Sequence, residues 1–452
     1  MIVAKFGGTS VGDAIAIRRT ADIIKGRLAR QPVVVVSALA GTTNALIAAA
    51  EQAAAGQLVA AITQVEALRA RHLDTARVLI GTGADADDVA AEIAMLFDEL
   101  AHLAEAFSVL GYLTPRSLDT ISAIGERLSA PIVAAAFRRL GIDAVLVDAR
   151  RVLITDATYG KAEPQEEAIA AAARALIVPL VQAGRVPVLG GFMGATKDGV
   201  TTTLGRGGSD YSAALFGAAL DAEAIEIWTD VDGMLTADPR VVPDAQLIEH
   251  IRFDEAAELA SFGAKVLHPN TIAPAVKRGI DVFICNSMRP EGNGTRITFD
   301  APTFPVRAIA GKGNTVVVKV RSPRMLGMPG ALRAIFDVFA RHKTSVDVVT
   351  TSEVSVSLTV DEGQPLEDVL AELREFGDVD IERGKGIVAL VGAGLGDSAP
   401  AMAKAIAAVG DTRLHMLSLS ATGINLTMIV DADQVQPVMR RLHAAFFSPE
   451  AA

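Results

Sequence analysis

The sequence predicts an α/β domain, with a mostly parallel sheet sandwiched by helices, followed by two copies of a smaller α+β unit. Two patterns lead to this prediction. Short β-branched runs alternate with Ala-rich helical stretches up to about residue 295, and the remaining chain repeats itself after 70 residues. At 452 residues the chain is also too long for one compact core, since a domain averages roughly 150 residues.

Six short apolar runs indicate the strands of the first domain. Each is rich in Val and Ile and is separated from the next by a helical stretch, which is typical of a parallel sheet buried on both faces. The runs are residues 2–6, 33–39, 144–149, 186–192, 224–230 and 281–286. We therefore place one α/β domain over residues 1–295.

Two further stretches define the limits of this domain. Residues 45–110 have an almost entirely helical pattern, broken at Gly81–Gly83, which indicates a helical insertion beside the sheet. Whether this insertion acts as a lid stays open. Residues 294–314 are rich in Gly and Pro and interrupt the α/β rhythm, so we place the domain boundary there.

The C-terminal part contains an internal repeat. A shift of 70 residues aligns 316–320 with 386–390, and the same shift aligns 354–360 with 424–430. Each copy reads as a strand, a helix, two strands and a helix, which is typical of a ferredoxin-like unit. The predicted units cover residues 314–385 and 386–452. Paired small units without obvious catalytic residues suit ligand sensing better than chemistry.

The composition excludes several classes of function. The chain has 42 Lys and Arg against 53 Asp and Glu, a net charge of −11, and only 4% of its residues are aromatic. A nucleic-acid partner would need a basic surface or stacking platforms, so none is expected. The single Cys285 allows no internal disulfide and indicates a reducing compartment. Without a signal peptide or a membrane-length apolar run, we expect a soluble cytoplasmic protein.

The first strand leads into a glycine-rich loop, residues 5–10, with the sequence Lys-Phe-Gly-Gly-Thr-Ser. Glycines let phosphate oxygens approach backbone N–H groups, the following helix favours negative charge at its N-terminus, and Lys5 adds a full positive charge. The loop matches neither the Walker pattern nor Gly-x-Gly-x-x-Gly. It is therefore a candidate phosphate site, and the alternative is a plain strand-to-helix turn with a surface lysine.

A second glycine loop, residues 205–210, surrounds Arg206 with small residues. A guanidinium group can hold a carboxylate through two parallel hydrogen bonds, so this loop is a candidate carboxylate site. Ser209 or Asp210 could instead cap the next helix, and both roles are compatible.

Acidic and polar residues also follow the strand at 224–230. Thr229 and Asp230 lie at its carboxyl end, which is where open α/β sheets bind ligands, and a simple acidic turn is the alternative. In the segment 262–269, small and special residues surround Lys265, which is either ligand-binding or structural. His268 is read as structural, because a proline follows it at a helix start.

Two more segments begin helices in this reading. Glu126 opens a helix predicted over residues 127–139, where the helix dipole favours a carboxylate, and Thr43 follows a strand at the start of another helix. Taken singly, each residue reads as a helix cap.

Together these segments resemble the aspartate kinase family, within the amino acid kinase superfamily. The resemblance rests on ordered segments: KFGGTS, SALAGTTN, TPRSLD with GERLSA, TTTLGRGGSDYSA, WTDVDGMLTADPR and FGAKVLHP. It covers the whole chain, because this family also ends in two tandem ACT domains. It implies a monofunctional kinase, since the length leaves no room for a fused homoserine dehydrogenase.

The resemblance implies ATP-dependent phosphorylation of the L-aspartate β-carboxylate to 4-phospho-L-aspartate, the first step towards lysine, threonine and methionine. ATP and Mg²⁺ are the implied cofactors, with Mg²⁺ carried by ATP and no direct protein ligand. Three catalytic residues are implied, namely Lys5, Arg206 and Asp210. The implied aspartate pocket contains Thr43, Glu126, Arg206 and Ser209. The implied ATP site contains Lys5, Gly7, Gly8, Thr229, Asp230, Leu235, Arg240 and Lys265, although many relatives carry Tyr in place of Leu235.

The C-terminal units are expected to regulate the enzyme. Residues 345–361 resemble the effector segment of lysine-sensitive family members, and the implied allosteric residues are Met325, Asp347, Ser352 and Glu353. Exposed turn charges are the alternative for Asp347 and Glu353. Lysine is the first choice of effector and threonine the second. In this family the first ACT domain is inserted into the second, which would add a strand at about 304–313 to the second unit. ACT domains also pair across a two-fold axis, which predicts a homodimer or a dimer of dimers.

Elementary chemistry agrees with this assignment. A carboxylate nucleophile is already ionised at pH 7 and needs no general base, so the barrier is the repulsion between two anions. Lys5, Arg206, Mg²⁺ and glycine-loop amides would offset that repulsion. One alternative is a kinase for glutamate or acetylglutamate, which the GERLSA segment and the ACT pair oppose. Another is a non-catalytic amino-acid sensor, which the intact charged residues of the loops oppose.

Overall fold

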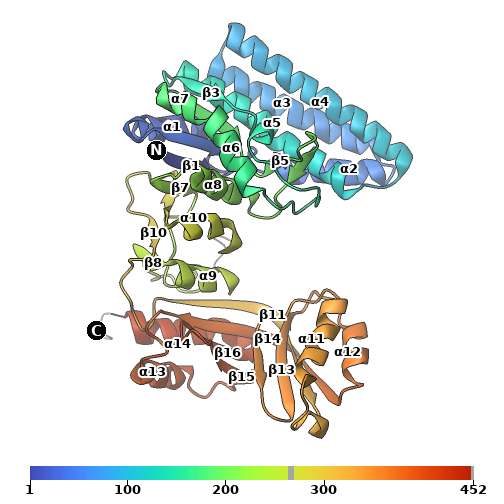
Figure 1. The fold of residues 1–452 in the computed structure, drawn as a ribbon, viewed down its shortest axis with the longest axis vertical. Helices are drawn as coiled ribbons and strands as arrows, with labels where there is room; N and C mark the ends of the chain where they lie inside the picture. Colours follow the sequence, from blue (N-terminus) through green and yellow to red (C-terminus); the bar gives the residue numbers. More distant parts are fainter. Residues whose placement is uncertain (263–268, 449–452) are drawn as a thin grey trace. The chain divides into compact units, whose positions relative to one another are not determined.

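The computed structural model describes residues 1–262 and 269–448 (Figure 1). The chain divides into two compact units. The first comprises residues 1–233 and 267–299, and the second comprises residues 234–266 and 300–452. Among the described residues, no helix is long and apolar enough to cross a membrane.

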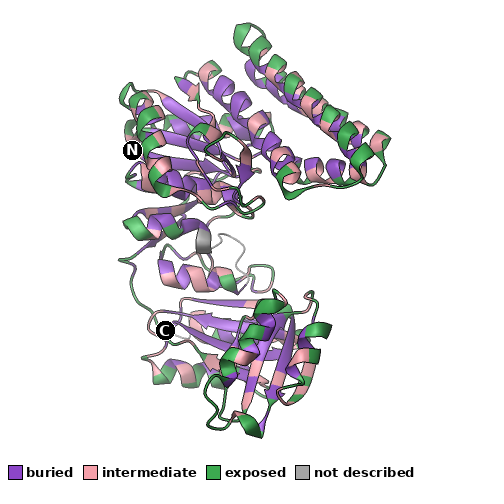
Figure 2. Ribbon diagram, turned by 45° about the vertical axis from the view of Figure 1, so that its right-hand side comes forward, coloured by how far each residue is buried: buried purple, intermediate pink, exposed green. Residues whose placement is uncertain are grey.

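The sheet of the first unit follows the predicted apolar runs. Its strands are ordered β3-β4-β2-β1-β7-β9-β10, and every neighbouring pair is parallel except β9 and β10. The strands are β1 (Ile2–Phe6), β2 (Pro32–Val36), β3 (Ala144–Leu146), β4 (Val186–Gly190), β7 (Ala224–Thr229), β9 (Asp281–Asn286) and β10 (Thr295–Thr298). Central strands such as β1 and β2 are buried at every position, as expected for apolar strands between two layers of helices (Figure 2).

Helices cover this sheet, and a short hairpin of β5 (Met193–Ala195) and β6 (Thr201–Thr203) leads towards α8. The helices are α1 (Ala14–Lys25), α2 (Thr42–Ala54), α3 (Leu58–Ile80), α4 (Ala84–Leu110), α5 (Pro115–Arg139), α6 (Glu166–Leu176), α7 (Val178–Gln182), α8 (Gly208–Ala219) and α10 (Ala273–Arg278). The predicted insertion at 45–110 corresponds to α2, α3 and α4, which pack together with α5 around one apolar core.

Helix α5 begins earlier than predicted. The sequence placed a helix at 127–139 with Glu126 at its start, but Thr114 is the N-cap and accepts a hydrogen bond from the Ser117 amide, while Pro115 takes the first helical position. Gly125 lies inside the helix at a point of close packing. A Cβ atom there would lie only 2.8 Å from the Ala38 Cβ atom, so the packing favours glycine. Glu126 is therefore an interior helix residue and not a cap.

The second unit is built on a six-stranded sheet with the order β12-β13-β11-β14-β16-β15, in which all neighbours are antiparallel. The strands are β11 (Ala308–Arg321), β12 (Val349–Thr351), β13 (Ser355–Asp361), β14 (Asp378–Val391), β15 (Met416–Leu419) and β16 (Asn425–Asp431). The helices are α11 (Ala331–Arg341), α12 (Glu367–Leu373), α13 (Ala399–Val409) and α14 (Val435–Phe447). Each repeat has its own apolar core.

The two long strands β11 and β14 belong to both repeats. Residues 308–312 of β11 pair with 387–391 of β14, and after an irregularity at 312–317 the same two strands continue with 317–321 opposite 378–382. The predicted added strand at 304–313 and the first strand of the predicted unit at 314–385 thus form one continuous strand. A single sheet results, because both strands cross from one repeat into the other.

Residues 234–262 are the main departure from the predicted domain limits. We assigned them to the first domain, and the structure groups them with the second unit, where they contribute β8 (His250–Arg252) and α9 (Phe253–Ser261). Polar contacts with the C-terminal part account for this grouping. Asn425 donates to Glu258 at 2.8 Å, and the Thr236 hydroxyl lies 2.9 Å from the His443 ring nitrogen Nε2.

Candidate active site

A cavity of about 550 Å³ lies in the first unit, where the loops after β1, β2 and β4 meet α5 and the β6–α8 loop. The structure brings seven of the predicted site residues to its wall. They are Lys5, Gly8, Thr43, Glu126, Arg206, Ser209 and Asp210. Segments as far apart in the sequence as Lys5 and Asp210 thus form one site, and they include both glycine loops.

Lys5 provides the buried positive charge of the cavity. It lies on the central strand β1, is only 8% exposed, and its Nζ atom is 2.6 Å from the Asp210 carboxylate. Asp210 lies in the first turn of α8, where the helix dipole also favours negative charge. The neighbouring loop is held in place because the Gly7 amide donates to the Trp228 carbonyl at 3.0 Å. Gly7 itself is not among the residues that line the cavity.

Glu126 presents a buried carboxylate to the same cavity. Its Oε1 atom accepts a hydrogen bond from the Ala38 amide at 3.1 Å, whereas Oε2 has no hydrogen-bond partner among the described residues. Burial raises the pKa of this carboxyl to about 8, and the Ala38 hydrogen bond and the charge of Lys5 act in the opposite direction. A buried carboxylate oxygen without a partner is costly, which is typical of a group that receives a ligand.

The Arg206 loop supplies an exposed cation. Arg206 is exposed and makes no ion pair within the described part of the chain. Helix α8 is capped by Gly207, whose φ of +73° suits glycine, and no side chain caps it, so Ser209 and Asp210 are not its caps. Ser209 approaches the backbone at Gly191 so closely that a side chain at 191 would lie 2.8 Å from the Ser209 Cβ atom. Thr43 is likewise not a cap, because α2 begins after Gly41.

Sequence reasoning missed two residues that organise this cavity. Asp119 also lines it and accepts hydrogen bonds from Gly160 and Thr203. Arg71 of α3 donates to the Ala40 carbonyl at 2.8 Å and to the Gly12 carbonyl at 2.9 Å, so it joins the loops after β2 and β1. Asp119 was visible as the acidic residue of the TPRSLD segment, but nothing local distinguishes Arg71 from the other basic residues of α3.

Thr229 and Asp230 lie at the carboxyl end of β7 and outside the cavity lining. The Thr229 hydroxyl donates to the Asp230 carboxylate at 3.1 Å, and the Thr229 carbonyl accepts from the Ser287 amide at 2.8 Å. The Ser10 hydroxyl contacts the Ser287 hydroxyl at 2.8 Å. The ends of β1, β7 and β9 are therefore hydrogen-bonded to one another at this edge of the sheet.

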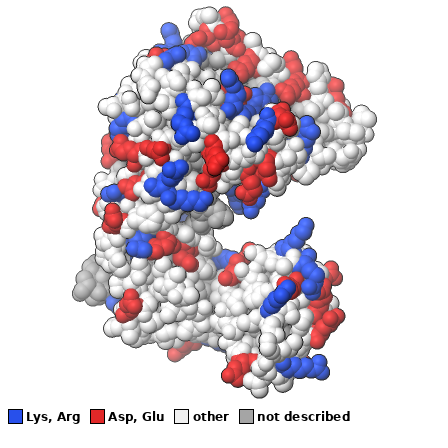
Figure 3. All heavy atoms as spheres, viewed as in Figure 1, with Lys and Arg blue, Asp and Glu red and all other residues white. Residues whose placement is uncertain are grey.

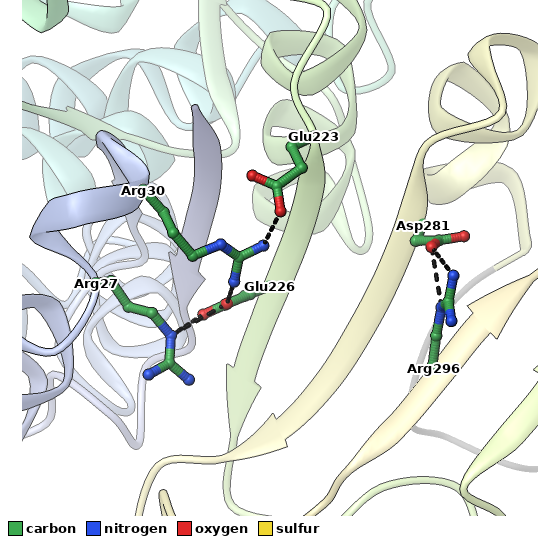
Figure 4. A network of polar contacts seen from close by, with 6 residues as sticks. All are labelled: Arg27, Arg30, Glu223, Glu226, Asp281 and Arg296. Atoms are coloured by element: carbon green, nitrogen blue, oxygen red, sulfur yellow. Dashed lines mark hydrogen bonds and ion pairs between the residues drawn. The ribbon is translucent and has the colours of Figure 1, made fainter.

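A network of charged residues holds β7 in place (Figure 4). The buried Glu226 accepts hydrogen bonds from Arg27 at 3.2 Å and Arg30 at 2.8 Å, and the Trp228 indole donates to it at 3.1 Å. Burial, together with the charge of Glu226, raises the pKa of the Cys285 thiol to about 12. A raised thiol pKa makes Cys285 less reactive, since the thiolate is the nucleophilic and metal-binding form.

The other predicted nucleotide residues belong to the second unit or lie outside the described residues. Leu235 forms an isolated bridge with Leu247, and the exposed Arg240 pairs with Asp238 at 2.6 Å. Lys265 and His268 lie outside the described residues. Among those that are described, no group of three His, Cys, Asp or Glu side chains is placed to hold a metal ion.

The predicted allosteric residues are distributed over the first repeat. Met325 lines a small cavity of about 170 Å³, whose wall does not include Asp347, Ser352 or Glu353. Asp347 precedes β12 and pairs with Lys312 at 2.7 Å, whereas Ser352 and Glu353 follow β12. Of these four residues, only Met325 lines that cavity.

The fold and the cavity define the class of protein. Residues 1–286, which contain the parallel sheet and the cavity, match the amino acid kinase family. The predicted fold class is confirmed by this match and by solved structures. The structure of Escherichia coli aspartokinase III in complex with aspartate and ADP (R-state) superimposes with a TM-score of 0.86 at 36% identity, covering 99% of this chain and 100% of that one.

Full-length relatives are more specific. The chain is 37% identical to the lysine-sensitive aspartokinase 3 of Escherichia coli K12, over 99% of both proteins. It is 35% identical to the chloroplastic aspartokinase 3 of Arabidopsis thaliana, over 99% of this chain and 82% of that protein. A solved structure of E. coli aspartokinase III with lysine and aspartate (T-state) matches with a TM-score of 0.81 at 37% identity, covering 99% of this chain and 100% of that one. The chain belongs to the aspartokinases of the amino acid kinase family, and it is a kinase.

Proposed function

We propose that this enzyme transfers the γ-phosphoryl group of ATP to the β-carboxylate of L-aspartate and forms 4-phospho-L-aspartate. The observation that carries the proposal is the unpartnered Oε2 atom of the buried Glu126, in the same cavity as the exposed Arg206. An amino acid offers an ammonium group for the first and a carboxylate for the second. The E. coli relative whose structure contains aspartate and ADP supports the same substrate pair.

The remaining cavity residues divide the work between binding and charge stabilisation. Thr43 and Ser209 offer hydroxyl groups to the bound aspartate. Lys5 offsets the negative charge that accumulates as the β-carboxylate attacks phosphorus, and its ion pair with Asp210 keeps the ammonium group at one place in the cavity. The attacking carboxylate is ionised at neutral pH, so the site needs no general base. Positioning and positive charge therefore account for the catalysis.

For the nucleotide we propose the loop and strand-end residues of the predicted ATP site, with Mg²⁺ entering on ATP. The members beyond Lys5 are Gly7, Gly8, Thr229, Asp230, Leu235, Arg240 and Lys265. Mg²⁺ would neutralise phosphate charge when bound with ATP, and we assign it no direct protein ligand.

We propose that the C-terminal repeats are ACT domains that regulate the enzyme, with residues 1–295 as the catalytic domain and 314–385 and 386–452, with 304–313, as the two regulatory domains. Lysine is the favoured effector, which the lysine-bound E. coli relative supports, and threonine is the second. Met325, Asp347, Ser352 and Glu353 are the proposed effector contacts. Because ACT domains pair across a two-fold axis, we propose that the chain forms a homodimer or a dimer of dimers. We propose that the enzyme acts in the cytoplasm, where its product would be used for the synthesis of lysine, threonine and methionine.

One assay tests the proposal directly. ATP turnover is measured with L-aspartate, L-glutamate and N-acetylglutamate as acceptors, and repeated with added lysine or threonine. We expect turnover with L-aspartate and inhibition by lysine. Turnover with L-glutamate or N-acetylglutamate alone would overturn the substrate, and inhibition by threonine alone would overturn the effector.

Arg206 tests the substrate-binding part of the proposal. Arg206→Ala is expected to raise the KM for aspartate by roughly 10- to 100-fold, because a charge-assisted hydrogen bond contributes about 1.5–3 kcal/mol. The KM for ATP should stay nearly unchanged. Arg139→Ala, which removes an exposed arginine outside the cavity lining, is the control. Equal increases in both KM values would show that Arg206 does not act on the carboxylate.

A further inference from the structure

Helix α5 brings two buried carboxylates to the active-site cavity. Asp119 is 2% exposed and Glu126 is 3% exposed, and both line the cavity. They are seven residues apart, which is two helical turns, so they lie on one face of α5 about 10 Å from each other along its axis. The proposed function uses only Glu126 for the substrate and leaves Asp119 without a role.

The hydrogen bonds of the two carboxylates differ. The Gly160 amide donates to Asp119 Oδ1 at 2.9 Å and Oδ2 at 3.0 Å. The Thr203 hydroxyl donates to Oδ1 at 2.7 Å, and the Thr203 amide donates to Oδ2 at 3.0 Å. Three donors, the shared Gly160 amide and the Thr203 amide and hydroxyl, therefore engage both oxygens of Asp119, whereas Oε2 of Glu126 accepts no hydrogen bond. Asp119 is thus held by the protein itself, and Glu126 is the carboxylate with an oxygen free to receive a substrate ammonium group.

The groups that donate to Asp119 come from two segments outside α5. Gly160 belongs to the loop between β3 and α6, and Thr203 ends β6 and lies three residues before Arg206. These two segments also touch each other. The Ala162 amide donates to the Thr203 carbonyl at 2.9 Å, and a side chain at Gly205, where φ is +76°, would lie 2.9 Å from the Gly160 carbonyl oxygen. Helix α5 and the Arg206 loop are therefore joined through Asp119.

We propose that Asp119 is a positioning residue that sets the distance between Glu126 and Arg206, and that it thereby contributes to the choice of L-aspartate over L-glutamate. This inference rests on the proposed function. Glu126 lies on the same helix face as Asp119, and Arg206 follows the strand that Asp119 holds. A substrate with an ammonium group on one residue and a carboxylate on the other is sensitive to their separation, and glutamate is longer than aspartate by one methylene group. Loosening the connection through Asp119 changes that separation without removing either contact.

The test uses the full-length enzyme with Asp119→Asn, which keeps the shape of the side chain but replaces one acceptor oxygen by an amide donor. We expect the KM for aspartate to rise about tenfold or more, because two hydrogen bonds to a charged acceptor are lost. The KM for ATP should stay unchanged, and the ratio of kcat/KM for aspartate to that for glutamate should fall. Thr203→Val removes only the hydroxyl bond and should give a smaller change in the same direction.

Asp156→Asn is the matched control. Asp156 lies in the same loop as Gly160 and accepts hydrogen bonds from Thr158 and Glu163, but it bonds neither α5 nor β6. It should leave the KM for aspartate close to that of the unsubstituted enzyme.

The outcomes separate this inference from the proposed function. If the unsubstituted enzyme does not phosphorylate aspartate, the proposed function fails. If it does, and Asp119→Asn and Thr203→Val lower the melting temperature without changing the KM for aspartate, or change both KM values equally, Asp119 is only structural. If Asp119→Asn does not fold, Thr203→Val decides by the same comparison of the two KM values.

Discussion

The two units of this chain differ in how their buried carboxylates are paired. In the first unit, Glu126 keeps one carboxylate oxygen without a partner inside a cavity. In the second unit, Glu255 is fully buried and occupied, because the Arg252 and Ala393 amides donate to it at 3.1 and 2.8 Å and Arg307 lies 3.7 Å away. The first arrangement is costly and useful for binding, whereas the second holds segments together.

The two units also differ in how their charged side chains form ion pairs. In the second unit, the carboxylate of Glu382 contacts Lys319, Lys385 and His415, and Asp431 contacts Lys385 and His415. In the first unit, Arg206 is left without an ion pair in the described chain. On the face shown in Figure 3, basic and acidic side chains are interspersed over the remaining surface. The cavity thus holds an unpaired cation together with a carboxylate oxygen that has no hydrogen-bond partner. Substitutions in the two units should therefore affect activity and stability separately.

The largest effect is expected from Lys5→Ala. It removes the buried cation that we propose to act on the developing negative charge, so kcat should fall by about 10³-fold. Lys25→Ala removes a lysine that pairs with Asp22 on the surface and serves as the control. Steady-state kinetics with aspartate and ATP measure both variants. If kcat of Lys5→Ala falls by less than tenfold, Lys5 does not act on the developing negative charge, and the proposed contrast between a catalytic first unit and a structural second unit fails.

A stability effect without an activity effect is expected from Glu255→Ala. The substitution leaves the Arg252 and Ala393 amides without an acceptor and Arg307 without its counter-charge, and should lower the stability of the second unit by about 3 kcal/mol. Calorimetry measures the unfolding, and the activity without effector should stay the same. Glu367→Ala, at an exposed helix position, should cost less than about 1 kcal/mol. An unchanged melting temperature for Glu255→Ala would refute the assigned role.

His72 makes the stability of the first unit depend on pH. It is buried against Phe97 with ring centroids 5.6 Å apart, and burial lowers its pKa from 6.5 to about 4. The unfolded chain takes up a proton below pH 6.5 and the folded chain does not, so stability is full above pH 6.5 and falls as the pH drops towards 4. At pH 5 this group should cost about 2 kcal/mol.

Urea unfolding followed by the fluorescence of Trp228, the sole tryptophan, measures this effect in the first unit. The difference in stability between pH 7 and pH 5 should be smaller in His72→Leu than in the unsubstituted protein. Identical differences would exclude His72 as the source.

The smallest expected effect is a dependence of the KM for aspartate on pH. The Glu126 carboxyl has a pKa raised to about 8, and only its ionised form can pair with an ammonium group. The ionised fraction grows as the pH rises towards 8, so the KM for aspartate should fall roughly tenfold between pH 6.5 and pH 8. In Glu126→Gln the KM should be higher and should not vary with pH in this range. A pH-independent KM in the unsubstituted enzyme would show that the carboxyl is already ionised.

Local patterns explain which parts of the site could be predicted. Lys5 and Arg206 were found because Lys5 directly precedes a glycine-rich loop and Arg206 lies in another, and the composition of such loops is visible in a short stretch. The helical start at Thr114 was missed because the glycine at 125 reads as a break when its packing against Ala38 is unknown. The sequence analysis placed residues 234–262 in the first domain. Their contacts with Arg307, Ala393 and Asn425 join distant parts of the chain and are not visible in the sequence.

The sequence by itself determined the six parallel strands of the first unit, most of the helices and the repeat of the second unit, because hydrophobic periodicity and an internal 70-residue shift are local or regular. Only the tertiary structure decided which carboxylate is already occupied. Asp119 and Glu126 are both buried acids of one helix, and the sequence does not distinguish their environments. The partners of Asp119 lie 41 and 84 residues away, so the hydrogen bonds of Asp119 and the unpartnered oxygen of Glu126 exist only once the chain has folded.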